Sequence, residues 1–296
     1  MATGVTTQQP FFENPYITVT EYKNAPTAID FDNLVVGGNA AAQDAELANV
    51  ILRASSFMDE YLNQNLNAST QVENQRTRMT ANGFLAIHPN NNPIISLQSL
   101  SYGTDPNSLV VLSDPSKAWF ENQQMIIPLS QLSLNYSSQG ALGFGGGAAP
   151  RQQIFVTYNY TSGYVNSLIA TATATQSTLT VQTADGIVAG MKLRIYDGAS
   201  SERVTVASNY TYGSTTVPLT APLAYTHANT VSIGNLPQTI KEACILVTTA
   251  FIKVRGDNSL TMNVTTQPNG NVNGATRYGS EMAIALEMLS LYRRIR

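Results

Sequence analysis

Histidine and cysteine are the residues of this chain whose types could ligate a metal or carry nucleophilic catalysis. The 296 residues include two histidines, His88 and His227, and one cysteine, Cys244. A structural zinc site takes Cys and His ligands at short, regular spacings, and no such spacing exists here. Neither histidine has a visible partner that would orient it as a base. We therefore expect structural or surface roles for both histidines and a buried, apolar setting for Cys244.

Serine, aspartate and glycine give no stronger signal for catalysis. No serine lies in a Gly-x-Ser-x-Gly turn, and Asp105, Asp114 and Asp197 stand beside turn residues without the spacing of a calcium loop. The glycine-rich run GALGFGGGAAP lacks the Lys-Ser/Thr of a phosphate loop. We expect it to form a loop that contacts a neighbouring subunit or lines a channel. Its central residues are Gly143, Phe144, Gly145, Gly146 and Gly147. The sequence predicts no enzyme, no cofactor and no metal site.

Composition indicates a protein with a sizeable core and an unusually uncharged surface. Hydrophobic residues make up 43% of the chain, whereas charged residues make up only 12%, roughly half of the usual fraction. Such a surface suits a protein that partners cover over much of its area, although a secreted adhesive protein could have the same composition. The first residues show neither a basic nor an apolar leader region, and no run is long enough to span a bilayer. We expect a soluble protein that is made in a cytoplasm and does not associate with membranes.

The net charge of −3 is distributed unevenly. Residues 1–60 hold eight acids against two bases, whereas residues 237–296 hold seven bases against four acids. An acidic front and a basic end could dock head to tail between neighbouring copies, but compositional drift explains the pattern equally well. No basic cluster is dense enough to predict tight nucleic-acid binding.

Apolar spacing predicts three helices. Residues 43–63 place large side chains on one face at three- and four-residue intervals, with Asp44 and Glu46 in the first turn. A second helix begins at Pro237, a residue suited to the first helical turn, and ends at Gly256. A third begins at Ser280, the expected N-cap, after a polar loop over residues 257–278.

Two stretches between the helices predict strands. Strands are expected near 83–88, 93–102, 108–113, 124–127 and 153–159, where turn residues separate apolar runs. Residues 168–235 are rich in Thr, Val, Ala and Gly without helical periodicity, and predict about five or six short strands in a small β-sandwich or barrel.

These elements predict an α+β fold. We expect a small helical bundle, made of the N-terminal helix and the two C-terminal helices, beside a β-strand segment and an inserted β module. The expected division is an N-terminal arm over 1–42, a core over 43–167 and 236–296, and an inserted β domain over 168–235. YITVTEYKNA within the arm could be a short strand or a turn before a nascent helix.

The order of these elements resembles that of a known family. LANVILRASSFMDEYLNQNL is followed by the pair GFLAIHP and PIISLQSLSYG, and the chain closes with PQTIKEACILVTTAFIKVR and a helix containing Leu289-Ser290-Leu291-Tyr292-Arg293-Arg294. This order resembles the head-to-tail adaptor (head-completion) proteins of long-tailed bacteriophages. The resemblance covers residues 43–103 and 236–296, under half of the chain.

The resemblance implies a mechanical function in the virion neck. Such adaptors form a homo-oligomeric ring, usually dodecameric, beneath the portal protein, and their other face receives a stopper or tail-terminator protein. Genomic DNA only passes through the lumen. Carried over to this sequence, the portal contact would involve Tyr292, Arg293, Arg294, Ile295 and Arg296.

Other functions share parts of the pattern. Another virion component, such as a tail terminator or a minor capsid protein, would have a similar composition but not the same order of helices and strand pair. An adhesin or carbohydrate-binding protein would fit residues 168–235 and the frequent tyrosines, and predicts glycan binding by that module. The tyrosines could be interface anchors or ordinary strand residues.

Overall fold

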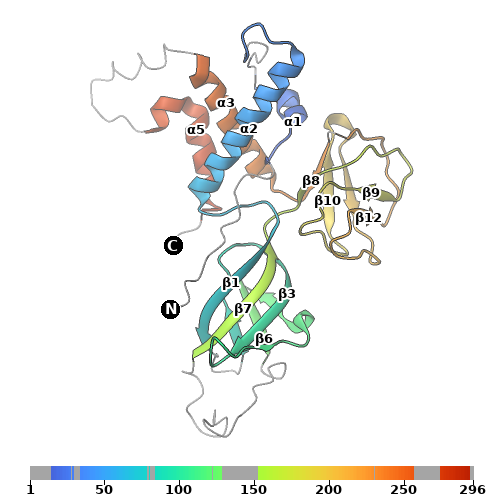
Figure 1. Cartoon of the computed structure of the whole chain (residues 1–296). Coiled ribbons are helices and arrows are strands. Elements are labelled where there is room, and N and C mark those ends of the chain that lie inside the picture. Colours follow the sequence, from blue (N-terminus) through green and yellow to red (C-terminus); the bar gives the residue numbers. More distant parts are fainter. Residues whose placement is uncertain are drawn as a thin grey trace, which may run out of the picture. The chain divides into compact units, whose positions relative to one another are not determined.

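The computed structural model describes residues 15–27, 29, 34–78, 80, 84–121, 123–128, 153–229, 231–256 and 274–293; of residues 254–256 and 274–279 it describes the backbone only. These residues form helices and antiparallel sheets, which confirms the expected α+β fold (Figure 1). Contacts divide them into two compact units. Ala68–Gly163 form unit 1, and the residues up to Asn67 and from Tyr164 onward form unit 2.

This division differs from the expected three segments. The first β segment forms a compact unit of its own, whereas residues 168–235 belong to the same unit as the helices. Where independently folding domains begin and end stays a prediction.

Unit 1 consists of two antiparallel sheets with strand orders β1-β7-β3-β4 and β2-β6-β5. Figure 1 shows β1, β7 and β3 side by side. The strands are β1 Ser69–Arg78, β2 Phe84–Ile87, β3 Ile94–Gly103, β4 Val110–Val111, β5 Trp119–Glu121, β6 Gln124–Pro128 and β7 Gln153–Ser162, with a 3₁₀ turn at Pro115–Lys117. The five strands expected in this region are confirmed. Its core contains Leu85, Leu100, Met125, Val156 and Tyr158, all fully buried.

Strand β1 was not expected, because its sequence STQVENQRTR has no apolar alternation. It pairs with β7 over its whole length, from Ser69 opposite Ser162 to Arg78 opposite Gln153. As an edge strand in its sheet, it presents polar and charged side chains, which discourages unwanted pairing. Backbone pairing with an apolar neighbour therefore determines this strand, and periodicity could not show it.

Helix α2, Ala40–Leu62, is the first predicted helix and begins three residues earlier than expected. The Asn39 side chain accepts a hydrogen bond from the Ala42 amide and caps it, and Asn63 ends it with a left-handed backbone at φ 55°. The placement of Asp44 and Glu46 in the first turn was wrong, because both follow that turn. They pair instead with Lys23 and Arg53.

The segment YITVTEYKNA contains a helix, α1 Val19–Asn24, rather than a strand or turn. Thr18 and Glu21 form a reciprocal capping box, in which each side chain accepts from the other residue's amide. Tyr16, Ile17 and Tyr22 are fully buried in the helical core. Part of the expected arm is therefore core, whereas residues 1–14 lie outside the described residues.

Helices α3, Gln238–Gly256, and α5, Gly274–Ser290, pack on each other and on α2. The Phe57 and Phe251 rings meet edge to face at 5.8 Å, and the Tyr61 hydroxyl donates to the Leu286 carbonyl. The prediction that the terminal helices bury their apolar faces against one another is confirmed. The prediction of Ser280 as an N-cap was wrong, because α5 begins six residues earlier, within the expected polar loop.

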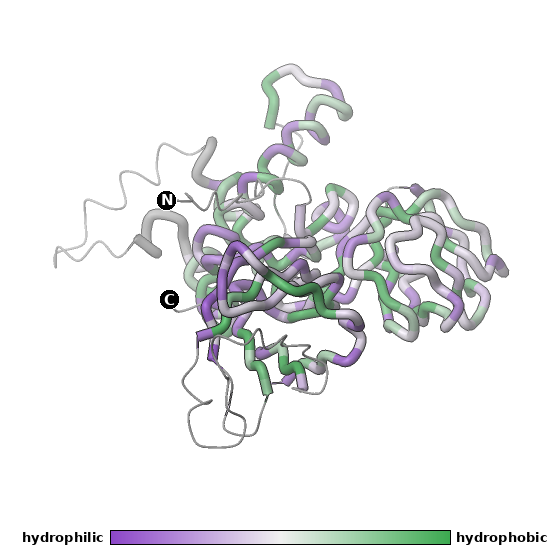
Figure 2. Tube along the Cα trace, turned by 60° about the horizontal axis from the view of Figure 1, so that its bottom comes forward, coloured by the Kyte–Doolittle hydropathy of each residue, from purple (hydrophilic) through white to green (hydrophobic). Residues whose placement is uncertain are grey.

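The stretch 168–235 forms the expected small β module. Its strands are β8 Asn166–Leu168, β9 Thr178–Thr180, β10 Lys192–Tyr196, β11 Glu202–Thr205, β12 Thr216–Pro218 and β13 Ser232–Gly234, with a 3₁₀ turn at Gly198–Ser200. Two sheets, β11-β10-β13-β8 and β12-β9, enclose a core that includes Leu179, Ile195 and Val217. Gly234 is required in β13, since a Cβ there would lie 2.2 Å from the Val165 carbonyl oxygen. Figure 2 shows short polar and apolar stretches alternating along the tube.

Candidate functional site

The C-terminal end of α5 is held by the other two large helices. The backbone carbonyl of Tyr292 accepts a 2.7 Å hydrogen bond from the side-chain amide of Gln64, which follows α2. The Tyr292 hydroxyl lies 2.9 Å from the hydroxyl of Thr239, in the first turn of α3. The Tyr292 amide donates to the Leu289 carbonyl and continues the helical turn. Residues far apart in the sequence thus fix the point where the chain leaves the bundle.

Two neighbours of Tyr292 face solvent at this end. Leu291 is 84% exposed, a high value for a large apolar side chain. The Arg293 guanidinium lies over the Tyr61 ring at 5.1 Å from its centroid, a cation–π arrangement that orients the charge. Tyr292 itself is only half-buried. The end of α5 therefore presents an apolar and a cationic side chain on an anchored turn.

Leu291 was not among the expected contact residues. Met282, Ala285 and Leu289 are buried on the predicted face of α5, and Leu291 falls outside that spacing. An apolar residue off the buried face was the available signal for it. Of the remaining expected contacts, Arg294, Ile295 and Arg296 lie outside the described residues. The same holds for the loop from Gly143 through Phe144, Gly145 and Gly146 to Gly147.

A buried ion pair connects the helices to the β module. Lys241 on α3 is 5% exposed, and its ammonium lies 2.5 Å from the Glu21 carboxylate and 3.2 Å from the Ser232 hydroxyl of β13. The same ammonium lies 3.5 Å from the centroid of the Tyr196 ring of β10. Burial lowers the pKa of Lys241, while the Glu21 carboxylate opposes this effect. The pair therefore joins α1, α3 and two strands at one point.

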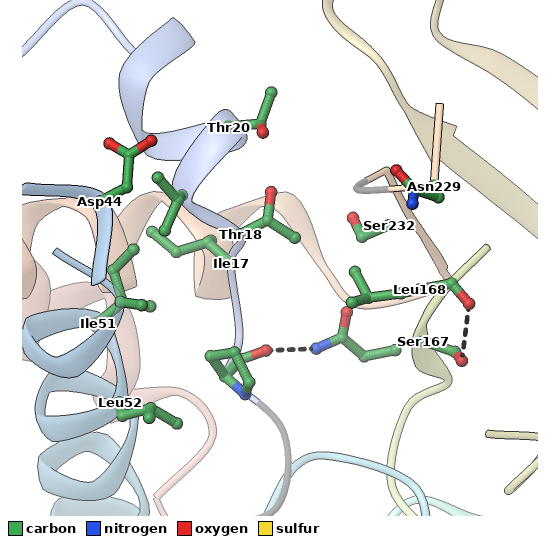
Figure 3. Close-up of a pocket in the computed structure, with 14 residues that line it drawn as sticks. Ile17, Thr18, Thr20, Asp44, Ile51, Leu52, Ser167, Leu168, Asn229 and Ser232 are labelled. Atoms are coloured by element: carbon green, nitrogen blue, oxygen red, sulfur yellow. Dashed lines mark hydrogen bonds between the residues drawn. The ribbon is translucent and has the colours of Figure 1, made fainter. Parts of the chain in front are cut away.

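A groove of about 560 Å³ opens in unit 2 between α1, α2 and the β module. Figure 3 shows Ile17, Ile51 and Leu52 on one side, with Leu168 and Ser232 on the other. Within the lining, the Asn166 side chain donates a 2.9 Å hydrogen bond to the Pro15 carbonyl and so connects the two walls. Ser232 belongs both to this lining and to the Lys241 cluster.

The two walls of the groove differ in chemistry. The helical wall is largely apolar, with Ala48, Ile51 and Leu52 of α2 beside Ile17. The wall from the β module is mostly uncharged and polar, with the amides of Asn166 and Asn229 and the hydroxyls of Ser167 and Ser232. Asp44 is the charged residue of the lining. Such a surface suits an uncharged ligand with an apolar face and a hydrogen-bonding face.

Two titratable groups are buried among the helices. The Tyr16 hydroxyl donates to the Asp59 carboxylate, and burial raises the pKa of Asp59 to about 7 even though this hydrogen bond lowers it. Cys244 is fully buried beside Ser55, as expected, and burial raises its pKa to about 12. A buried thiol of this kind is unreactive, because the thiolate is the nucleophilic form.

His227 is fully buried in the β module between two carboxylates. Its Nδ1 lies 2.8 Å from an Asp197 oxygen, and its Nε2 lies 2.8 Å from a Glu202 oxygen. Asp197 stands at the N-cap position of the 3₁₀ turn, but its side chain contacts His227 and caps no amide there, whereas the Asp105 and Asp114 side chains do cap turns. His227 connects the 3₁₀ turn to β11, which is the expected structural role. His88 is exposed.

Unit 1 carries an exposed aromatic pair at the edge of its smaller sheet. Trp119 and Phe120 of β5 are 39% and 40% exposed, and β5 pairs with β6 alone. The Phe84 and Trp119 rings meet edge to face at 5.3 Å. In the same unit, Tyr158 and Tyr160 are buried strand residues whose hydroxyls donate to the Glu73 carboxylate.

The described residues contain no cluster of three His, Cys, Asp or Glu side chains placed to hold a metal ion. Within the same part of the chain, no helix combines the length and apolar character needed to cross a membrane.

Comparison with known proteins assigns no family to the chain. No protein-family model matches it, and no curated protein matches it significantly. A solved structure described as the neck of an empty GTA particle computed with C6 symmetry aligns with 96% of this chain and 95% of its own, at 12% identity and a TM-score of 0.35. A TM-score this low does not establish a shared fold.

Proposed function

We propose that this chain is a structural subunit of a virion neck, an adaptor that forms a ring between the portal and the stopper or tail. One observation carries the proposal. The helical segments that resemble the adaptor family lie far apart in the sequence, and they pack as one bundle of α2, α3 and α5. Gln64 and Thr239 then fix the C-terminal turn at Tyr292.

The end of α5 is the proposed portal contact. Leu291 supplies exposed apolar area, and Arg293 supplies a cation oriented by Tyr61. Arg294, Ile295 and Arg296 follow directly in the sequence. The exposed part of the Tyr292 side chain adds to the proposed contact surface, and its hydroxyl positions the turn through Thr239. An apolar anchor with adjacent arginines is a frequent arrangement at energetically important interface positions.

The remaining partners follow from the proposed ring. The opposite face of the ring receives the stopper or tail-terminator protein, and the loop Gly143–Gly147 contacts a neighbouring subunit or lines the channel. The genome passes through the lumen. A net charge of −3 suits this passage, because phosphate binding strengthens with each Lys or Arg contact.

The proposal is tested by binding to DNA-filled, tail-less heads. Purified protein is mixed with heads and separated by sedimentation, and the bound fraction is measured. Wild-type protein should sediment with the heads, and a variant lacking residues 293–296 should remain free. Equal attachment of this deletion variant would refute the assigned portal contact. Failure of the wild-type protein to bind competent heads would refute the adaptor function.

A further inference from the structure

The N-terminal sequence of the chain has a composition that complements the two walls of the groove in unit 2. Residues 1–14 read MATGVTTQQPFFEN, with one charged side chain, Glu13. Val5 and the adjacent Phe11 and Phe12 are apolar, and two threonines, two glutamines and a proline lie between Val5 and Phe11. A segment with a single charged side chain, which combines aromatic side chains with amides and hydroxyls, matches one apolar wall and one polar, uncharged wall.

The position of this segment in the chain brings it to the groove. It precedes Pro15, which lines the groove and accepts the hydrogen bond of Asn166. Fourteen residues can extend at most about 45 Å from that point. In each copy, this segment therefore begins beside the groove of that copy.

We propose that this groove binds residues 1–14 of a neighbouring copy of the chain, an inference that rests on the ring proposed above. Phe11 and Phe12 pack against Ile51 and Leu52 of α2, and the polar residues of the segment face the β module. In the proposed ring, the segment of one copy extends away from its own Pro15 and enters the groove of the next copy. Each copy gives one segment and receives one, as closed head-to-tail rings require.

A peptide with the sequence of residues 1–14 tests the recognition. It is titrated into protein lacking these residues, and binding is followed by calorimetry. We expect saturable binding, which Ala48→Trp abolishes because the new ring fills the groove. Ala45→Trp is the matched control, since Ala45 lies exposed on the same helix outside the lining. Absence of binding, or equal binding by the two tryptophan variants, would overturn the proposal.

Paired cysteines test whether the groove takes its ligand from a second copy. Full-length Phe12→Cys protein is mixed with full-length Leu52→Cys protein and oxidised, and covalent heterodimers are counted by mass. Cys244 is fully buried and does not compete. We expect a heterodimer with Leu52→Cys and at least tenfold less with Ala45→Cys. A variant that carries both Phe12→Cys and Leu52→Cys distinguishes the two cases. If it forms an intramolecular cross-link, and the mixed single variants form no heterodimer, each chain fills its own groove and the proposal is overturned.

These measurements can contradict the groove proposal without contradicting the proposed function. Neither uses heads or portal, so attachment of the wild-type protein to heads with no peptide binding would refute the groove alone. Peptide binding and heterodimers with no attachment to heads would refute the adaptor function and leave the contact between copies in place.

Discussion

The side-chain amide of Gln64 donates a 2.7 Å hydrogen bond to the backbone carbonyl of Tyr292, and this bond joins the end of α2 to the end of α5. Carbonyls in the last turn of a helix lack partners inside the helix, and Gln64, which is buried, supplies one here. The bond therefore determines where the proposed portal contact leaves the bundle.

Gln64→Leu should weaken this attachment without disrupting the core, since leucine keeps much of the volume but donates no hydrogen bond. We expect the free energy of unfolding to fall by about 1 kcal/mol, and the affinity for heads to fall with it, because the C-terminal turn is less well positioned. Urea unfolding and sedimentation measure the two effects. Glu287→Gln, an exposed change on α5, is the control. Unchanged stability and unchanged attachment would show that the bond does not position the turn.

Charge and apolar area at the end of α5 should affect binding rather than folding. Arg293→Glu and Leu291→Asp replace exposed side chains, so the free energy of unfolding should change little. Attachment to heads should weaken by about tenfold, equivalent to ~1.4 kcal/mol. Lys192→Glu, an exposed charge reversal on β10, should leave attachment unchanged. If all three variants attach equally well, the portal contact lies elsewhere on the chain.

Local sequence patterns predicted the helices and most strands, since burial of one face imposes a period. Leu47, Val50 and Ile51 illustrate this on α2, where the expected face is the buried face. The polar strand β1 carried no such pattern, because pairing with β7 determines it. Helix starts were misplaced at Asn39 and before Ser280, where polar and small residues surround the true start.

The candidate site was less accessible to sequence reasoning, because its contacts join distant residues. Glu21 and Lys241 are 220 positions apart, and Gln64 and Tyr292 are 228 apart. No spacing rule connects such pairs. The final arginines were predicted as contact residues through a resemblance, whereas Leu291 required knowledge of which face of α5 is buried. The groove required the helices and the β module to be placed together.

Removing one partner of the Glu21–Lys241 pair should destabilise the protein more than replacing both partners. Lys241→Met leaves the largely buried Glu21 carboxylate without its cation, and we expect a loss of about 3 kcal/mol in the free energy of unfolding. Combining it with Glu21→Gln should restore most of that loss, because the unpaired charge is then removed. Urea unfolding of the two single variants and the double variant measures this. A single variant as stable as Lys192→Met would show that the pair contributes nothing.

Asp59 should make stability depend on pH near neutrality. Burial raises its pKa from 3.8 to about 7 in the folded chain, so the folded state binds the proton more tightly. The resulting stabilisation is fully present below the unfolded pKa and is lost as pH rises through about 7.

Asp59→Asn removes this titration and keeps an acceptor for the Tyr16 hydroxyl. Relative to wild type, the variant should gain about 2 kcal/mol in the free energy of unfolding between pH 5 and pH 8. Urea unfolding at both pH values gives the difference. A constant difference between the two proteins would contradict the raised pKa.

Electron microscopy of the portal vertex tests the central claim most directly. Purified protein is incubated with DNA-filled, tail-less heads whose portals accept another neck protein, and the vertex is reconstructed. We predict a new ring of density beneath the portal, with the C-terminal ends of α5 directed toward it and a copy number that can be counted. An unchanged vertex would contradict the assignment of this chain as the adaptor of the neck.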